Sequence, residues 1–134
     1  MNDLPVDPTE RTAGATAVAV FEAYRDSDRE AAEALIADDF RFTSPLDNGL
    51  DRKAYFERCW LNNESIAGFE FVRVVENGGE AVVTYEARMV DGRRFRNTEV
   101  LTARDGQLTR AEVYFGWSVP HEAPQGGFLE RKTG

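Results

Sequence analysis

The chain has 134 residues, 42% of them hydrophobic and 30% charged, which is long and apolar enough for one domain with its own core. Its 16 Lys and Arg against 24 Asp and Glu give a formal charge of -8, which argues against nucleic acid and anionic membranes as partners. Cys59 is the only cysteine, and neither a signal peptide nor a long apolar run is recognisable, so we expect a cytoplasmic protein without disulfides.

The first predicted helix begins at Asp7-Pro-Thr-Glu10, which combines an N-cap carboxylate, a proline at the first helical position and a glutamate three residues after the cap. It is expected to end near Ser27. Its apolar residues recur at three- and four-residue spacing and predict a buried stripe: Ala13, Ala17, Val20, Phe21 and Tyr24.

Two shorter helices are predicted next. Ser27-Asp-Arg-Glu30 reads as a second capping box, and the helix after it is expected to end at Asp38-Asp39. Asp51 is the predicted cap of a third helix from Arg52 to about Leu61, with Tyr55, Phe56, Cys59 and Trp60 on one face.

Period-two alternation predicts five strands, at residues 40–44, 69–76, 80–89, 95–104 and 108–117. Pro45 and Asn48-Gly49 are expected to break the chain after the first. The last four are joined by short segments rich in Gly, Asn and Asp, which tolerate the positive φ of hairpin turns. The pattern predicts an α+β domain with three N-terminal helices packed on a strongly curved, mostly antiparallel sheet.

The end of the chain is expected to be irregular. Residues 118–134 contain Pro120, Pro124 and Gly126-Gly127, which disfavour a further regular element. No internal repeat or second domain is recognisable, so residues 1–134 are interpreted as one domain with its core at about 10–117.

Three stretches carry a resemblance to a known family. They are Val20-Phe-Glu-Ala-Tyr-Arg-Asp-Ser-Asp28, Leu35-Ile-Ala-Asp-Asp-Phe-Arg-Phe-Thr-Ser-Pro45 and Asp105-Gly-Gln-Leu-Thr-Arg-Ala-Glu-Val-Tyr-Phe115. Together with the order of elements, they resemble SnoaL-like members of the nuclear transport factor 2-like superfamily, over residues 10 to 117. The resemblance implies that the curved sheet and the helices enclose a conical pocket, and that two copies pair through the outer sheet face as a homodimer.

The function implied by the resemblance is the binding of a small, largely apolar and partly oxygenated molecule. The superfamily includes isomerases, cyclases, dehydratases and epoxide hydrolases, so cofactor-free proton-transfer chemistry is one expectation. A binding or interaction module without chemistry is the alternative, because a fold does not determine a function.

Glu99 is the first candidate for chemistry. Phe95, Asn97, Glu99 and Leu101 share one strand face, and the apolar residues at both ends predict that this face looks inward. Burial of a carboxyl raises its pKa, so Glu99 is a candidate acid or oxyanion donor, with Asn97 as an orienting amide. A cross-strand polar pair with an Arg or Thr neighbour is the structural alternative.

The resemblance to ketosteroid isomerases departs at two positions. Ser44 and Pro45 stand where those enzymes place the proton-shuttling aspartate, and Val20 falls near the position of their catalytic tyrosine. Asp47 is a candidate replacement base, against the alternative that it caps a turn. The epoxide hydrolase pattern, with an arginine between two aspartates, is replaced here by Asn97-Thr98-Glu99.

The predicted ligand-binding residues come from several elements and point to one interior. Tyrosine and tryptophan suit cavity walls because they combine a large apolar face with a polar tip, and core packing is the alternative for each of them. The set is Tyr24, Phe42, Ser44, Tyr55, Trp60, Tyr85, Val113, Phe115 and Trp117.

His121 is the only histidine, and it is interpreted as a surface imidazole or, alternatively, a general base. A single histidine and a single cysteine cannot assemble a histidine-rich metal site, so neither a metal nor a cofactor is expected. A mixed polar outer sheet face is predicted from the opposite strand parity, at Arg88, Arg96, Thr98, Thr102, Arg110, Glu112 and Tyr114.

Overall fold

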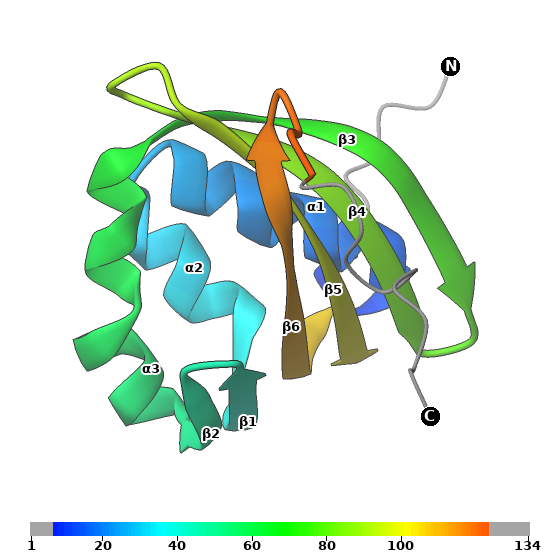
Figure 1. The fold of residues 1–134 in the computed structure, drawn as a ribbon. Helices are drawn as coiled ribbons and strands as arrows, with labels where there is room; N and C mark the ends of the chain where they lie inside the picture. The colour runs from blue at the N-terminus through cyan, green and yellow to red at the C-terminus, as the bar shows by residue number, and fades with distance from the viewer. Residues whose placement is uncertain (1–6, 124–134) are drawn as a thin grey trace, which may run out of the picture.

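The computed structural model describes residues 7–123, which form three helices and a six-stranded sheet (Figure 1). The helices are α1 (Ala13–Arg25), α2 (Arg29–Leu35) and α3 (Arg52–Arg58), with short 3-10 turns η1 (Pro8–Glu10) and η2 (Trp60–Ser65). The strands are β1 (Ile36–Ser44), β2 (Asp47–Asp51), β3 (Ile66–Asn77), β4 (Glu80–Met89), β5 (Arg94–Arg104) and β6 (Gln107–Val119).

The sheet order is β2-β1-β6-β5-β4-β3. Strands β3 to β6 form an antiparallel meander in chain order, as the hairpin turns predict, and β1 joins it in parallel beside β6. The sheet curves around α1, and all three helices lie on its inner side (Figure 1). The predicted α+β class with helices on one face of a curved, mostly antiparallel sheet is therefore confirmed.

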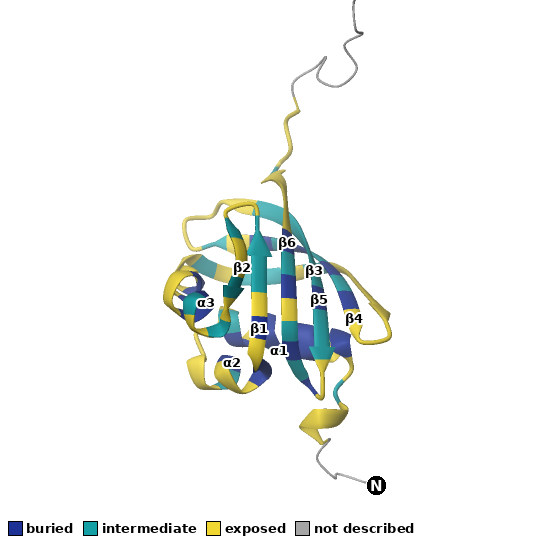
Figure 2. Ribbon diagram, turned by 90° about the horizontal axis from the view of Figure 1, so that it is seen from below, coloured by how far each residue is buried: buried dark blue, intermediate teal, exposed yellow. Residues whose placement is uncertain are grey.

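The core lies between this inner face and the helices. Strand β4 alternates between buried and less buried residues, as Figure 2 shows. Helix α1 buries Ala13, Ala17, Val20 and Phe21 of the predicted stripe, while Tyr24 is partly buried. Phe40, Leu101, Leu108 and Val83 are among the largest fully buried side chains. Phe40, Leu101 and Leu108 also border the open space that remains between the sheet and the helices.

The first two helices begin later than predicted. Asp7 caps only the turn η1, and α1 starts at Ala13 under the cap of Thr12. Asp28 rather than Ser27 caps α2, because the Ser27 hydroxyl is hydrogen-bonded to Asn63 and its backbone has a φ of 55°. The capping residues were recognised, but their competing local bonds could not be read from their spacing.

The segment after α2 differs most from the prediction. Ile36 belongs to β1 and not to a helix, and residues 47–51 form the edge strand β2 instead of a break. Gly49 has a φ of 62°. Its backbone amide donates a hydrogen bond to the Thr43 hydroxyl, and this bond closes the β1–β2 hairpin. The turn residues were therefore correctly recognised, but they join two strands.

Strand β6 carries a bulge near its end. Asn97 pairs with Phe115 and Phe95 with Ser118, so Gly116 and Trp117 together face the single residue Arg96. A side chain at Gly116 would collide with the Arg96 carbonyl. The bulge ends the alternation that predicted an inward Trp117: its side chain is 53% exposed and stacks on His121.

The end of the chain is partly described. Strand β6 runs to Val119, two residues beyond the predicted boundary, and residues 120–123 are irregular as expected. The rest of the predicted irregular tail, 124–134, lies outside the described residues. No helix among residues 7–123 has the length and apolar character needed to cross a membrane.

The predicted outer face residues lie on the side of the sheet away from the helices. Glu86 on β4 pairs with Arg94 and Arg96 on β5, and the hydroxyls of Thr84 and Thr98 are bonded to each other. Homodimer formation through this face stays a prediction.

Asp51 caps α3 as predicted, and its removal is expected to destabilise the fold. Its carboxylate accepts a hydrogen bond from the Ala54 amide at 2.9 Å. Asp51→Ala should lower the free energy of unfolding by about 1 kcal/mol in urea titrations, because that amide loses its partner. Asp51→Ser should restore most of it. An alanine variant as stable as the parent would show that this cap contributes nothing.

Candidate functional site

The inner face of the sheet and the helices enclose a cavity of about 370 Å³. Its apolar wall comes from α1, from the inward residues of β1 and β3 to β6, and from the β1–β2 hairpin. Among the described residues that line it, none is Lys, Arg or His, and Glu99 and Asp47 are the only carboxylates. The cavity suits a small, mainly apolar molecule.

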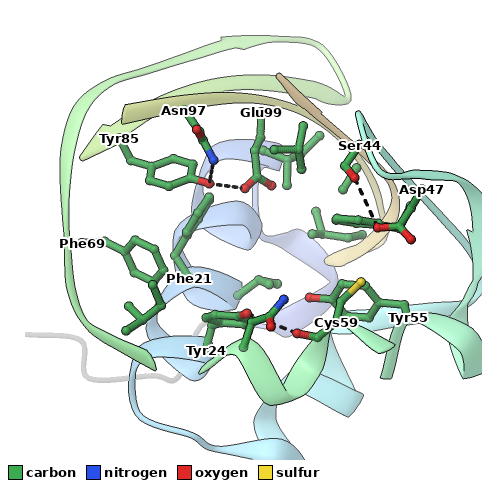
Figure 3. A pocket seen from close by; sticks show the side chains of 18 of the residues that line it. Phe21, Tyr24, Ser44, Asp47, Tyr55, Cys59, Phe69, Tyr85, Asn97 and Glu99 are labelled. Carbon is green, nitrogen blue, oxygen red and sulfur yellow. Dashed lines mark hydrogen bonds between the residues drawn. The ribbon is translucent and has the colours of Figure 1, made fainter. Parts of the chain in front are cut away.

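Glu99 lies on the sheet wall within a chain of hydrogen bonds (Figure 3). The Tyr85 hydroxyl donates to Glu99 Oε2 at 2.7 Å, and Asn97 Nδ2 donates to the Tyr85 oxygen at 3.3 Å. The Gly116 amide donates to Asn97 Oδ1 at 3.1 Å, which orients that amide. The bulge that turns Trp117 outward therefore also supplies the bond that orients Asn97.

Burial raises the pKa of Glu99 to about 7, and the hydrogen bond from Tyr85 offsets part of this increase. The alternative for Glu99 is a cross-strand polar pair with an Arg or Thr neighbour. A cross-strand bond is present, but the partner is Tyr85 on β4, and no salt bridge to Glu99 is present among residues 7–123. Glu99 lines the cavity, and its Oε1 has no hydrogen-bond partner among the same residues. Near neutral pH this carboxyl can donate a hydrogen bond to a ligand or accept one.

The helix side of the cavity carries Tyr24, Tyr55 and Cys59 (Figure 3). The Tyr24 hydroxyl donates to the Cys59 carbonyl at 3.2 Å. Burial, and secondarily the charge of Asp47, raises the pKa of the Cys59 thiol to about 11, so it stays protonated at neutral pH. This wall therefore presents hydroxyl and thiol groups but no charge.

Asp47 lies at the mouth of the cavity in the β1–β2 hairpin. Its carboxylate accepts a hydrogen bond from the Ser44 hydroxyl at 3.2 Å and pairs with Arg58 at 3.0 Å. Leu46 beside it lines the mouth and is 77% exposed. Asp47 lines the cavity, and both of its carboxylate oxygens have side-chain partners. The turn amide of Leu46 is bonded by the Ser44 hydroxyl and not by Asp47.

The structure brings most of the predicted site residues to this one cavity: Glu99, Asn97, Asp47, Tyr24, Phe42, Ser44, Tyr55, Tyr85, Val113 and Phe115. Trp60 and Trp117 do not line it. Trp60 is buried behind Tyr24, with the ring centroids 5.5 Å apart, and Trp117 is displaced by the bulge. Whether the lining residues bind a ligand stays a prediction.

Several cavity residues were not predicted, and some carried a usable signal. Phe95 and Leu101 share the strand face of Glu99, and Phe21 lies on the apolar stripe of α1, so the same periodicity pointed to all three. Leu46, Asn62 and Ser65 line the cavity from the hairpin and from η2, where no periodic pattern was available.

Val20 and Ser44, which stand at the positions of the isomerase tyrosine and aspartate, both line the cavity. His121 lies outside it, stacked on Trp117 with ring centroids 4.7 Å apart. Within residues 7–123, no three His, Cys, Asp or Glu side chains are grouped as they are around a metal ion.

The family model of the SnoaL-like domain matches residues 17–111 of the chain. No curated protein matches the chain. A Kribbella flavida DSM 17836 protein, provisionally described as a ketosteroid isomerase, superimposes with a TM-score of 0.67 at 20% identity, covering 91% of this chain and 90% of that one.

Two further solved structures are similar. An NTF2-like protein of unknown function from Burkholderia xenovorans LB400 has a TM-score of 0.66 at 22% identity, covering 88% of this chain and 91% of that one. An LEH-like epoxide hydrolase from M. tuberculosis has a TM-score of 0.63 at 20% identity, covering 78% and 82%. At these identities the likeness shows the fold and not the reaction. Since the domain match spans most of the described chain, the protein belongs to the SnoaL-like family, and its fold is that of the NTF2-like structures.

Proposed function

We propose that this protein binds a small, largely apolar molecule that carries a carbonyl or similar oxygen, and that Glu99 donates a hydrogen bond to that oxygen. The observation that carries the proposal is a carboxyl of raised pKa on the wall of an apolar cavity, with one oxygen bonded to Tyr85 and no salt bridge among residues 7–123. In a low-dielectric site such a donor stabilises negative charge that develops on the ligand oxygen far better than water does.

The chemistry that this arrangement supports is cofactor-free proton transfer, of the isomerase, cyclase or dehydratase type. In such a step a base, for which the cavity residue Asp47 is the candidate, takes a proton from the carbon next to the carbonyl. The electron pair of the broken C–H bond moves to the carbonyl oxygen, and the protonated Glu99 carboxyl stabilises this enolate by donating a hydrogen bond to it. Tyr85 and Asn97 hold the Glu99 carboxyl in place.

Binding without chemistry is a second candidate function, and the state of Asp47 favours it. A proton transfer from carbon needs a base, and the second carboxylate of the cavity, Asp47, is already bonded to Arg58 and Ser44.

The free, buried thiol of Cys59 is compatible with a reducing compartment, so the proposal keeps the cytoplasm as the location.

The test uses 2-acetylnaphthalene, a flat aryl ketone with no titrating group, and measures its dissociation constant by calorimetry from pH 6 to pH 9. The wild type should bind it at least tenfold more weakly at pH 9 than at pH 6, because Glu99 loses its proton with a pKa of about 7. Glu99→Gln should bind it with little dependence on pH, and Asp47→Asn should keep the wild-type profile.

A wild-type affinity that is flat across this range, or no binding at all, would contradict the role assigned to Glu99. Chemistry is separated from binding by exchange in D₂O, where NMR follows the loss of the acetyl protons of the bound ketone. Exchange in the wild type that disappears in Glu99→Gln would support proton transfer. Binding without any exchange would leave the non-catalytic function in place.

A further inference from the structure

The hydroxyl of Tyr55 is a buried polar group without a hydrogen-bond partner in the described part of the chain. The residue is only 7% exposed, and Tyr55 Oη makes no hydrogen bond to any of residues 7–123. It is not fully enclosed either, since among those residues the side-chain polar atom that is both enclosed and unpartnered is Arg96 Nε. Tyr55 lines the cavity, so the accessible side of its hydroxyl faces that space.

The other tyrosine hydroxyls of the cavity are already bonded. Tyr24 donates to the Cys59 carbonyl, and Tyr85 donates to Glu99. Among the described residues that line the cavity, Tyr55 is therefore the tyrosine whose donor is still available. A buried hydroxyl is normally hydrogen-bonded, because leaving it unpaired costs its desolvation energy.

The ring of Tyr55 is held firmly by its neighbours. Phe40, Phe42 and Phe56 surround it, with ring centroids 5.1, 5.1 and 5.3 Å away. The side chain cannot turn to seek another partner without disturbing this packing. Burial raises its pKa well above the usual value, so the hydroxyl stays a neutral donor at physiological pH.

Tyr55 and Glu99 face the cavity from opposite walls. Tyr55 projects from α3 on the helix side, and Glu99 projects from β5 on the sheet side (Figure 3). Most of the lining between these two walls is apolar, including Phe21, Phe69 and Val113. Each wall thus offers one available hydrogen-bonding group across an apolar space.

We propose that Tyr55 is a second ligand-binding residue of the cavity, and that the ligand carries two oxygen functions, one bonded by Glu99 and the other by Tyr55. The inference rests on the proposed function and narrows its ligand class from oxygenated apolar molecules to those with two separated oxygens. A ligand with a single oxygen leaves the Tyr55 hydroxyl buried and unpaired, which disfavours it.

The test compares 2-acetylnaphthalene with its 5-, 6- and 7-hydroxy derivatives, which place a second oxygen at different distances from the carbonyl. Dissociation constants are measured by calorimetry at pH 6 for the wild type, Tyr55→Phe and the matched control Tyr24→Phe. At least one hydroxy derivative should bind the wild type about tenfold more tightly than the parent ketone, the gain expected from one satisfied buried hydrogen bond.

Tyr55→Phe should abolish this preference while binding the parent ketone within about twofold of the wild type, because only the hydroxyl is removed. Tyr24→Phe should retain the preference, since the hydroxyl it removes is bonded to the backbone. Thermal unfolding of both variants checks that they are folded.

Two outcomes overturn the inference and leave the proposed function intact. In the first, every derivative binds the wild type no better than the parent ketone. In the second, Tyr55→Phe weakens all the compounds equally, which indicates a packing role. If the wild type binds none of the compounds, the proposed function fails and the inference fails with it.

Discussion

Replacing Glu99 with glutamine is expected to stabilise the protein at high pH. Relative to the wild type, the variant should gain about 2–3 kcal/mol of unfolding free energy between pH 5 and pH 8.5. The reason is the pKa of Glu99, which burial raises from 4.5 to about 7 in the folded chain. Each unit of such a difference is worth ~1.4 kcal/mol.

The direction of this effect follows from proton linkage. Between pH 4.5 and pH 7 the folded state holds the Glu99 proton more tightly than the unfolded state does. The contribution of Glu99 to stability is therefore greatest below this window and falls as the pH rises through it. Glutamine stays neutral and still accepts the hydrogen bond from Tyr85, so the variant loses this contribution to the pH dependence.

Urea unfolding of both proteins at half-unit pH steps measures the difference directly, and other titrating groups cancel in the subtraction. Glu80→Gln is the matched control, since it makes the same chemical change at an exposed position at the start of β4. The unfolding free energy of Glu80→Gln should stay within about 0.5 kcal/mol of the wild-type value at every pH. If Glu99→Gln were increasingly destabilising as the pH rises, Glu99 would be a charged, partnered group in the folded state.

The meander and the inward position of Glu99 followed directly from periodicity. Alternation in residues 80–89 and 95–104 reproduces β4 and β5 within a residue, and the shared face of Phe95, Asn97 and Glu99 is the face that lines the cavity. These elements are long and have one buried face, so their side-chain pattern reports the tertiary structure.

The features that escaped prediction depend on contacts between distant segments. Strand β2 has no alternating pattern of its own and exists because β1 pairs with it. The bulge at Gly116 and Trp117 arises because these two residues lie opposite the single residue Arg96. This pairing between two strands cannot be recognised from the pattern of either strand alone. The hydroxyl of Tyr55 is available because its neighbours in space are phenylalanines contributed by β1 and α3.

Replacing Phe40 with alanine is expected to lower the free energy of unfolding by about 3–5 kcal/mol, more than Asp51→Ala. This is the usual cost of removing a buried aromatic side chain. Phe40 is 1% exposed in the middle of β1, and its ring packs edge-on against Tyr55 at 5.1 Å. It also lines the cavity, so the space it vacates joins an existing opening that the walls cannot close by collapsing. Small domains are stable by only about 5–15 kcal/mol, which makes this loss severe.

Urea titrations of Phe40→Ala and Phe40→Leu separate lost volume from lost aromatic contact. Leucine refills most of the space, so its loss should be clearly smaller than that of alanine. Leu46→Ala is the control: it also lines the cavity, but at 77% exposure it should change the unfolding free energy by about 0.5 kcal/mol or less. A Phe40→Ala loss below about 1 kcal/mol would mean that the wall beside Tyr55 is loosely packed, and that the Tyr55 hydroxyl can turn towards a protein partner.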